Sequence, residues 1–223
     1  MPSDLAGLDA VLLDMDGTLV DTEGLWWEAA AAVAESLGRP LGPADVPHVQ
    51  GRTIEDVAAH LLPDSPGLLR DAPRLVLEGP GPLPGGLRRS AVVRLLTDAF
   101  ADRIRGELTV MPGAPELLAG LAATAVPTAL VSASPRSIVE LVLPRLGHAF
   151  DLVIANEDTA RGKPYPDPYL EAARRLGAAP RRCVAIEDSP AGIAAATAAG
   201  CRVLVVEPER GLPSLDRVRD SFG

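Results

Sequence analysis

The sequence is poor in lysine. Lys163 is the only lysine in 223 residues, whereas twenty positions carry arginine. Composition alone would therefore place an arginine in the segment G-K-P-Y-P-D that contains it. An ammonium is compact and approaches a phosphoryl oxygen as a point charge, which a planar guanidinium does not do in the same way. The one lysine is thus a candidate for phosphoryl chemistry.

Several other features are also missing. The two cysteines, Cys183 and Cys201, show no zinc-ligand spacing and lie in apolar runs, so we expect buried free thiols in a reducing compartment. The N-terminus has no basic segment followed by an apolar stretch, and no window reaches about 18 consecutive apolar residues. These absences argue against export and against membrane spanning, and they make the cytoplasm the expected location.

Positive charge is scarce as well. Lys and Arg number 21 against 30 Asp and Glu, which gives a formal net charge of −9. Nucleic-acid binding depends on clustered cations that neutralise backbone phosphates, so we expect no nucleic-acid partner. A phosphate-bearing substrate would have to meet local cations, including a bound divalent metal.

The sequence does contain short apolar runs that alternate with alanine-rich helical stretches, a pattern typical of a parallel α/β sheet. We predict strands over 9–14, 126–132, 152–155, 183–187 and 202–206. Several of these runs are apolar at consecutive positions, as expected for strands covered by helices on both faces. Ser134 before Pro135 and Ser189 before Pro190 predict two helix starts, and Gly200 predicts a helix end.

Between residues 19 and 108 the strand signal disappears. Apolar spacing predicts amphipathic helices over 26–37, 54–62 and 92–104, whereas 78–86, which reads E-G-P-G-P-L-P-G-G, predicts an exposed loop. We therefore divide the chain into a core, residues 1–18 and 109–223, and a helical insert, residues 19–108. An apolar fraction of 47% is enough to fill a substantial core.

In an open parallel sheet, ligands bind beyond the carboxyl ends of the strands. Polar residues follow four of the predicted strands, namely Asp14 and Asp16, Ser132, Lys163, and Glu187 with Asp188. The segments that contain them, D-M-D-G-T-L, V-S-A-S, G-K-P and I-E-D-S, resemble in order the four motifs of the haloacid dehalogenase superfamily. The chain is most similar to the subgroup with a helical cap after the first motif, which includes phosphoglycolate phosphatase, β-phosphoglucomutase and sugar-phosphate phosphatases.

This resemblance implies a Rossmann-like core with an inserted helical cap domain. It also implies a Mg²⁺-dependent phosphatase that hydrolyses a small phosphorylated metabolite, such as a sugar phosphate or a phosphoglycolate-like compound, through an aspartyl-phosphate. By the same resemblance, Asp14 is the nucleophile and Asp16 is the acid that protonates the leaving oxygen and then deprotonates water. We expect a monomer or a homodimer.

The remaining roles also come from the resemblance. Mg²⁺ would be held by Asp14, the backbone carbonyl of Asp16, Asp188 and, directly or through water, Glu187. Ser132, the Ala133 N–H and Lys163 would grip the phosphoryl oxygens with help from the helix N-terminus after Ser134. Thr18 would lie near the acid and help to bind the substrate, and Asp167 would brace the Lys163 loop. The insert segment with Gly51 and Arg52 would contact the rest of the substrate.

Other activities of the superfamily fit less well. Metal-independent dehalogenases lack the second aspartate, which is present as Asp16, and phosphonatases need a cap lysine, which the insert lacks. β-Phosphoglucomutases carry a histidine where Trp26 or Trp27 stands and a lysine where Gln50 stands. A phosphosugar mutase stays the main alternative, and a non-catalytic protein that binds a phosphometabolite is the alternative of another class.

Overall fold

The computed structural model describes residues 5, 7–62, 85–206 and 211–221, the side chains of 85–88 excepted. The chain forms two compact units: Met1–Asp21 together with Thr109–Gly223, and Thr22–Leu108. No helix in the described part of the chain is both long enough and apolar enough to cross a membrane. The loop expected over 78–86 lies mostly outside the described residues, but its last two residues, Gly85 and Gly86, begin a helix instead.

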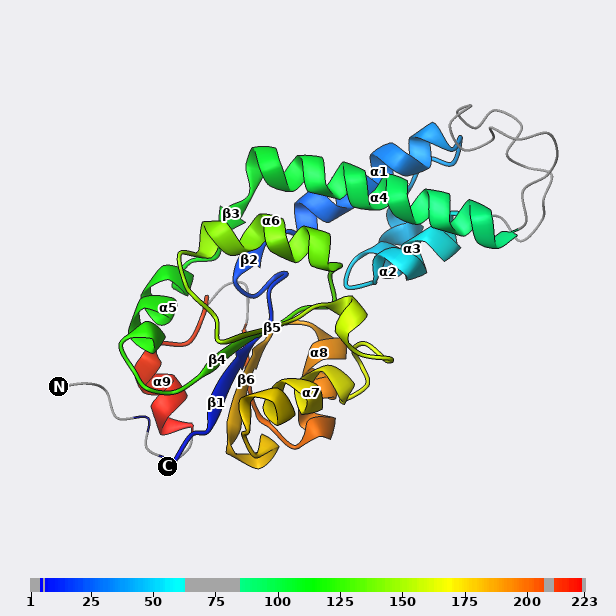
Figure 1. Ribbon diagram of the computed structural model, residues 1–223. Coiled ribbons are helices and arrows are strands. Elements are labelled where there is room, and N and C mark those ends of the chain that lie inside the picture. The colour runs from blue at the N-terminus through cyan, green and yellow to red at the C-terminus, as the bar shows by residue number, and fades with distance from the viewer. Residues whose placement is uncertain (1–4, 6, 63–84, 207–210, 222–223) are drawn as a thin grey trace. The chain divides into compact units, whose positions relative to one another are not determined.

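The first unit is built on a five-stranded sheet in which every pairing is parallel, in the order β5-β4-β1-β6-β7 (Figure 1). The strands are β1 (Ala10–Leu13), β4 (Thr128–Val131), β5 (Leu152–Ile154), β6 (Cys183–Glu187) and β7 (Arg202–Val205). Each lies within two residues of its expected position, so the predicted α/β class is confirmed. The central strand is β1, whose Leu12 pairs with Ala129 on one side and Ala185 on the other.

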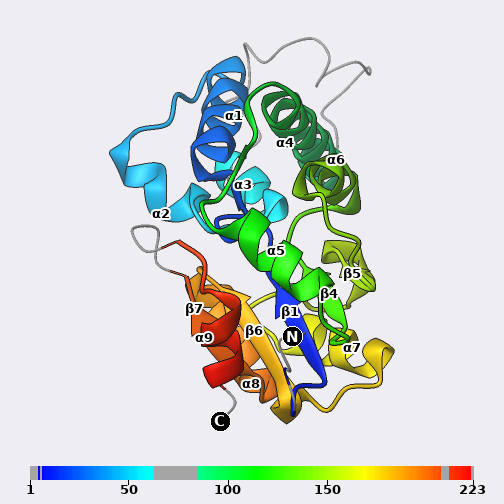
Figure 2. The ribbon, with the colours of Figure 1, turned by 90° about the vertical axis from the view of Figure 1, so that its left-hand side faces the viewer.

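Helices cover both faces of this sheet, as the consecutive apolar positions of its strands require (Figures 1 and 2). On one face lie α7 (Asp167–Leu176) and α8 (Pro190–Ala199). On the other lie α5 (Ala114–Ala122), α6 (Arg136–Leu146) and α9 (Leu215–Asp220).

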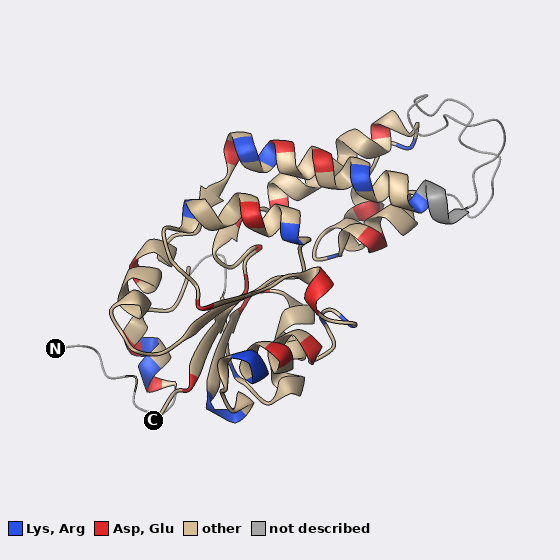
Figure 3. Ribbon diagram, in the orientation of Figure 1, with Lys and Arg blue, Asp and Glu red and all other residues tan. Residues whose placement is uncertain are grey.

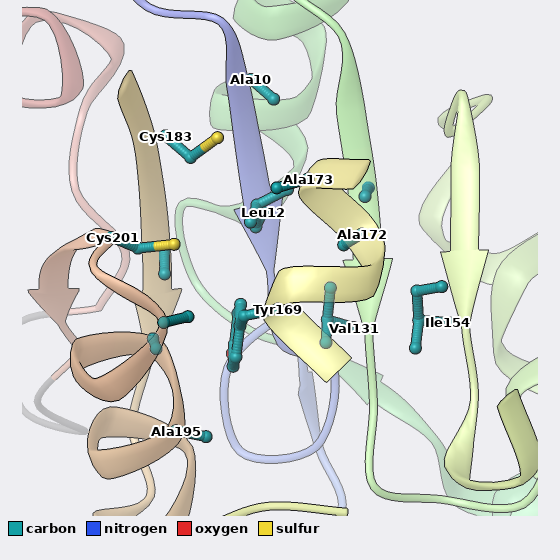
Figure 4. Close-up of a cluster of buried hydrophobic side chains, with 14 residues drawn as sticks. Ala10, Leu12, Val131, Ile154, Tyr169, Ala172, Ala173, Cys183, Ala195 and Cys201 are labelled. Atoms are coloured by element: carbon teal, nitrogen blue, oxygen red, sulfur yellow. The ribbon is translucent and has the colours of Figure 1, made fainter. Parts of the chain in front are cut away.

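The face under α7 and α8 holds a core cluster in which alternate strand residues, such as Leu12 and Val131, meet the buried Tyr169 of α7 (Figure 4). Cys183 and Cys201 are free thiols whose sulfurs turn toward the centre of this cluster. Burial raises the pKa of Cys183 to about 12 and that of Cys201 to about 11, so both pack as small apolar groups.

Two of the three helix-boundary signals hold. Ser189 caps α8, where its Oγ accepts from the Gly192 N–H at 3.0 Å, and Gly200 ends the helix with a φ of +88°. The third expectation is wrong, because α6 begins at Arg136 and the residue before it is Pro135 rather than Ser134. The Ser134 hydroxyl is therefore available for another contact.

A second, two-stranded sheet was not expected. The strand β2 (Val20–Asp21) pairs antiparallel with β3 (Thr109–Val110) at the two ends of the insert. Strands of two residues are too short to show an alternating pattern, so the sequence gives no sign of them. Just before β2, the Gly17 N–H donates to the Val20 carbonyl at 2.8 Å, which closes a turn directly after Asp16.

The second unit contains α1 (Glu23–Ser36), α2 (Val46–Val49), α3 (Ile54–Leu61) and α4 (Gly85–Glu107). Trp26 is buried in this unit, donates its indole N–H to the Val49 carbonyl at 2.9 Å and packs edge-on against Phe100. Acidic and basic residues are interspersed along its helices (Figure 3). Arg103 of α4 pairs with Glu28 of α1.

Candidate active site

The predicted site residues of the first unit meet at the carboxyl edge of the sheet. Asp14 follows the central strand β1, and its N–H donates to the Ile186 carbonyl of β6 at 3.0 Å. Ser132 follows β4 on the other side of β1, and its N–H donates to the Ile154 carbonyl of β5 at 2.9 Å. Because β1 pairs with both β4 and β6, the sheet brings together segments more than 170 residues apart.

Lys163 lies at the centre of this arrangement. Its Nζ donates to Asp14 Oδ1 at 2.5 Å, to Glu187 Oε1 at 2.5 Å and to the Val131 carbonyl at 2.9 Å. An ammonium has three N–H donors, and each one here has an acceptor. With 4% of its side chain exposed, Lys163 is a buried cation fixed in one position against Asp14.

Glu187 is the fully buried partner that fixes Lys163. Its Oε1 also accepts from the Tyr169 hydroxyl at 2.5 Å, and its Oε2 accepts from the Ser189 hydroxyl at 3.1 Å. The carboxylate packs against the first turn of α8, where a Cβ on Gly192 would lie 1.8 Å from Oε1. A glycine is therefore required there. Tyr169 becomes part of the site although nothing in its sequence position singled it out.

The charges in this cluster do not balance. Asp14, Glu187 and Asp188 supply three carboxylates against the one ammonium of Lys163. Burial, and then the nearby Glu187, raise the pKa of Asp14 well above its usual value, while Lys163 acts in the opposite direction. Burial also raises the pKa of Asp188 to about 6, against the hydrogen bond from Thr18. For Lys163, burial opposes the charge, but Asp14 and Glu187 still raise its pKa.

This excess of negative charge fits a divalent cation. Among the described residues, Asp14, Glu187 and Asp188 form the one group of three that could hold a metal, with ligand atoms all within 4.8 Å of one another. Asp188 is oriented by the buried Thr18, whose hydroxyl donates to Oδ1 at 2.9 Å. Its Oδ2 lies over Gly17, where a Cβ would come within 2.2 Å. Carboxylate oxygens in such a group suit Mg²⁺.

Asp16 faces a different set of partners. Its Oδ2 accepts from the Ser134 hydroxyl at 2.8 Å and from the Ser132 hydroxyl at 3.2 Å. The Ser134 N–H in turn donates to Ser132 Oγ at 2.9 Å. We expected Ser134 only as a helix cap. Its place two residues after Ser132, in the segment V-S-A-S, was the signal that could have marked it as a site residue.

The helix N-terminus after Ser134 is less open to an anion than we expected. The Arg136 N–H donates to both carboxylate oxygens of Glu157, at 3.0 and 3.2 Å, and Pro135 has no N–H. We find no acceptor for the Ala133 N–H among the described residues. Ala133 is therefore the amide of this turn that is best placed to meet a phosphoryl oxygen.

The loop that carries Lys163 is braced from outside. Asp167 accepts from Arg161 Nε and from its NH2 nitrogen, each at 3.0 Å, and the Arg161 guanidinium lies 4.7 Å from the centre of the Tyr165 ring. The contacts of Asp167 are those expected of a residue that supports the loop.

The remaining candidates belong to the second unit. Gly51 has a φ of +65°, which favours glycine, and Thr53 caps α3 by accepting from the Asp56 N–H at 3.2 Å. Arg52 is exposed and donates from Nε to the Pro47 carbonyl at 3.0 Å. The burial of Trp26 and the indole bond to Val49 give that residue a packing role in this unit.

Comparison with known proteins agrees with this geometry. Residues 8–200 match the family model of the haloacid dehalogenase-like hydrolases. The chain belongs to this family. Hexitol phosphatase B of Escherichia coli K12 is 33% identical over 199 residues, which cover 88% of this chain and 82% of the relative. The chain is accordingly an enzyme, a phosphatase of the haloacid dehalogenase family.

Two solved structures illustrate the fold. A mutant of CbbY from Rhodobacter sphaeroides, solved with xylulose-(1,5)-bisphosphate, has a TM-score of 0.70 at 26% identity and covers 96% of each chain. β-Phosphoglucomutase from Clostridium difficile has a TM-score of 0.73, covers 96% of this chain and 97% of its own, and is 17% identical. At that identity the second likeness shows the fold alone.

The Tyr169 hydroxyl generates a first prediction. Tyr169→Phe removes one donor from the buried Glu187 while keeping the ring, so we expect the free energy of unfolding to fall by about 1–3 kcal/mol. Tyr165→Phe is the matched control, because Tyr165 is exposed and should change stability by less than about 0.5 kcal/mol. Urea unfolding of both variants measures the difference, and equal values would contradict a role for the Tyr169 hydroxyl.

Proposed function

We propose that this enzyme is a Mg²⁺-dependent phosphatase that hydrolyses a small phosphorylated sugar or related metabolite through an aspartyl-phosphate. The observation that carries the proposal is the buried contact of Lys163 with Asp14, next to a group of carboxylates that fits a divalent cation. The substrate class is supported by the likeness to hexitol phosphatase B and to CbbY with its bound xylulose-(1,5)-bisphosphate.

In the first step, an Asp14 oxygen attacks the phosphorus of the substrate. The bond from phosphorus to the ester oxygen breaks, its electron pair goes to that oxygen, and Asp16 gives the oxygen a proton. Lys163 holds Asp14 and brings positive charge to the site, while Ser132 and the Ala133 N–H donate to the phosphoryl oxygens.

In the second step, Asp16 takes a proton from water as the water oxygen attacks the phosphorus of the aspartyl-phosphate. The bond between phosphorus and Asp14 breaks, and its electron pair returns to the Asp14 carboxylate. Inorganic phosphate is released, and both aspartates regain their starting protonation states.

Asp14, Asp188 and the backbone carbonyl of Asp16 would hold Mg²⁺ at the edge of this site. Glu187 would contact the ion directly or through water, although Oε1 also accepts from Lys163 and Tyr169 and Oε2 from Ser189. A bound Mg²⁺ would neutralise charge on the phosphoryl oxygens and keep Asp14 ionised. Thr18 would act on Asp188 rather than on the substrate, because it is fully buried.

Hydrolysis is favoured over the mutase alternative by the insert. The positions at which mutases carry a histidine and a lysine hold tryptophan and glutamine here, and neither side chain can transfer a proton as histidine does. The indole N–H of Trp26, moreover, donates to the Val49 carbonyl. Water is then the acceptor that Asp16 activates.

A phosphate-release screen tests the proposal. The purified protein is assayed with Mg²⁺, and with a chelator in its place, over hexitol phosphates, pentulose bisphosphates, phosphoglycolate, nucleoside monophosphates and an aryl phosphate. We expect Mg²⁺-dependent release that is fastest with a sugar or sugar-alcohol phosphate. A protein that binds these compounds but releases no phosphate would be the non-catalytic alternative, and conversion of a sugar 1-phosphate to its 6-phosphate would indicate a mutase.

Asp14→Asn should abolish turnover, because it removes the nucleophile with little change of volume. Asp21→Asn, at an exposed carboxylate seven positions later, is the matched control and should keep full activity. Phosphate release and circular dichroism of both variants test this expectation. Full turnover by Asp14→Asn would rule out an aspartyl-phosphate at this residue.

Lys163→Arg should lose roughly two orders of magnitude in kcat, or about 2.7 kcal/mol in barrier, although the charge is kept. The three acceptors around Nζ suit an ammonium, and a planar guanidinium cannot direct its donors at all three. Steady-state kinetics with the best substrate measures the loss. Near-normal turnover would remove Lys163 from the proposed mechanism.

Arg52→Ala should raise KM for the best sugar phosphate by roughly tenfold or more but change KM for a small aryl phosphate little, because Arg52 would bind the non-reacting part of the substrate. Arg105→Ala, at another exposed arginine of the same unit, is the control. An equal effect on both substrates would mean that Arg52 acts on the phosphoryl group or on the fold.

A further inference from the structure

Ser134 is a polar residue of the site to which the proposed mechanism gives no task. Its hydroxyl makes the shorter of the two hydrogen bonds to Asp16 Oδ2, 2.8 Å against 3.2 Å for Ser132. It sits two residues after Ser132, in the turn between β4 and α6. The bond crosses from this turn to the segment after β1, 118 residues away along the chain.

The backbone of Ser134 is held on both sides. Its N–H donates to Ser132 Oγ at 2.9 Å, and its carbonyl accepts from the Asn156 N–H at 3.1 Å. The next turn residue with an N–H, Arg136, donates it to Glu157 and pairs its guanidinium with Asp158. The turn is thus tied to the segment after β5, so the Ser134 hydroxyl is presented to Asp16 from a fixed backbone.

The two serines differ in what else they must do. Ser132 has one hydroxyl proton, and in the proposed mechanism it donates that proton to a phosphoryl oxygen. When substrate is bound, Ser132 therefore releases Asp16. The Ser134 hydroxyl has no such competing task, so it can stay on Oδ2 while the ester bond breaks.

From this we infer that Ser134 is a positioning residue that holds the Asp16 carboxyl group in place while Asp16 protonates the leaving oxygen. A carboxyl group whose Oδ2 accepts from Ser134 presents its proton on Oδ1, so the serine fixes which oxygen faces the leaving group. This inference rests on the proposed function, because it assigns Ser134 to the acid of that reaction. It also predicts that the effect of losing Ser134 depends on the leaving group, which does not follow from phosphatase activity alone.

The test compares two substrates of the same enzyme. 4-Nitrophenyl phosphate releases 4-nitrophenolate, a good leaving group that departs without taking a proton. Phenyl phosphate has a poorer leaving group, the phenol oxygen, which needs a proton from the enzyme. The ratio kcat/KM reports the steps up to formation of the aspartyl-phosphate, so it isolates leaving-group departure from later attack by water. We expect Ser134→Ala to lower kcat/KM for phenyl phosphate by roughly tenfold or more, and for 4-nitrophenyl phosphate by less than about threefold.

Two further variants make the comparison specific. Ser137→Ala, at an exposed serine that is the second residue of α6, should leave the kcat/KM of both substrates unchanged. Ser132→Ala should slow both substrates alike, because it removes a donor to the phosphoryl group that both share. Ser134→Thr keeps the hydroxyl and should recover most of the loss with phenyl phosphate.

Each outcome decides the matter. A loss confined to the poorer leaving group supports the inference. Equal losses of kcat/KM on both substrates would mean that Ser134 acts on the phosphoryl group. No loss on either substrate would mean that it only shapes the turn. Either result overturns the inference. If the wild-type protein releases phosphate from neither of these substrates nor from any compound of the phosphate-release screen with Mg²⁺, the proposed function itself fails. A crystal structure of Ser134→Ala with inorganic phosphate bound adds a check without turnover, since Ser132 would then face the phosphate and the Asp16 carboxylate should leave its present position.

Discussion

Three acceptors surround the single ammonium of Lys163 in the interior of the sheet unit: the Asp14 and Glu187 carboxylates and the Val131 carbonyl. Removing these charges from water costs several kcal/mol per ion, and apolar residues of similar volume would often be as stable or more so. Fold stability alone therefore gives a weak reason for this group of charges. A reaction that needs a fixed cation beside an ionised nucleophile gives a stronger one, and it also explains why this position alone carries lysine in a chain that otherwise uses arginine.

The surrounding structure follows from keeping those charges in place. The buried oxygens of Glu187 accept from Lys163, Tyr169 and Ser189, which satisfies them away from water, and the side chain finds room against α8 because residue 192 has no side chain. Asp188 is held in the same manner by Thr18, over a glycine that also makes the turn after Asp16. The residues around the site thus either donate hydrogen bonds to the buried carboxylates or, as glycines, leave room for them.

Much of this could be predicted from the sequence, and the limit has a physical cause. Apolar runs bounded by glycine and proline predict the strands, and the order of parallel strands brings Asp14, Ser132 and Glu187 to one edge. The hydrogen bonds of Tyr169 and Ser134 were not predictable, because they join residues 18 and 118 positions apart whose spacing carries no periodic signal. Only the place of Ser134 in the segment V-S-A-S marked it as a neighbour of the site. A tyrosine on the core-facing side of a helix predicts only that its ring is buried. A serine before a proline predicts a helix cap, and this pattern is the same whether or not the serine hydroxyl also donates to an aspartate.

The groups assigned to the phosphoryl reaction all belong to the unit formed by Met1–Asp21 and Thr109–Gly223, in which the parallel sheet brings residues from four strand ends to one edge. The unit Thr22–Leu108 has its own core, in which Trp26 packs on Phe100 and bonds to Val49, the residue that ends α2 just before the loop with Gly51 and Arg52. Because each unit is stabilised by its own contacts, side chains in that loop can change without disturbing the buried charges around Lys163. Under the proposed function, in which Arg52 binds the non-reacting part of the substrate, selection among phosphorylated metabolites can therefore vary in one unit while the chemistry stays fixed in the other.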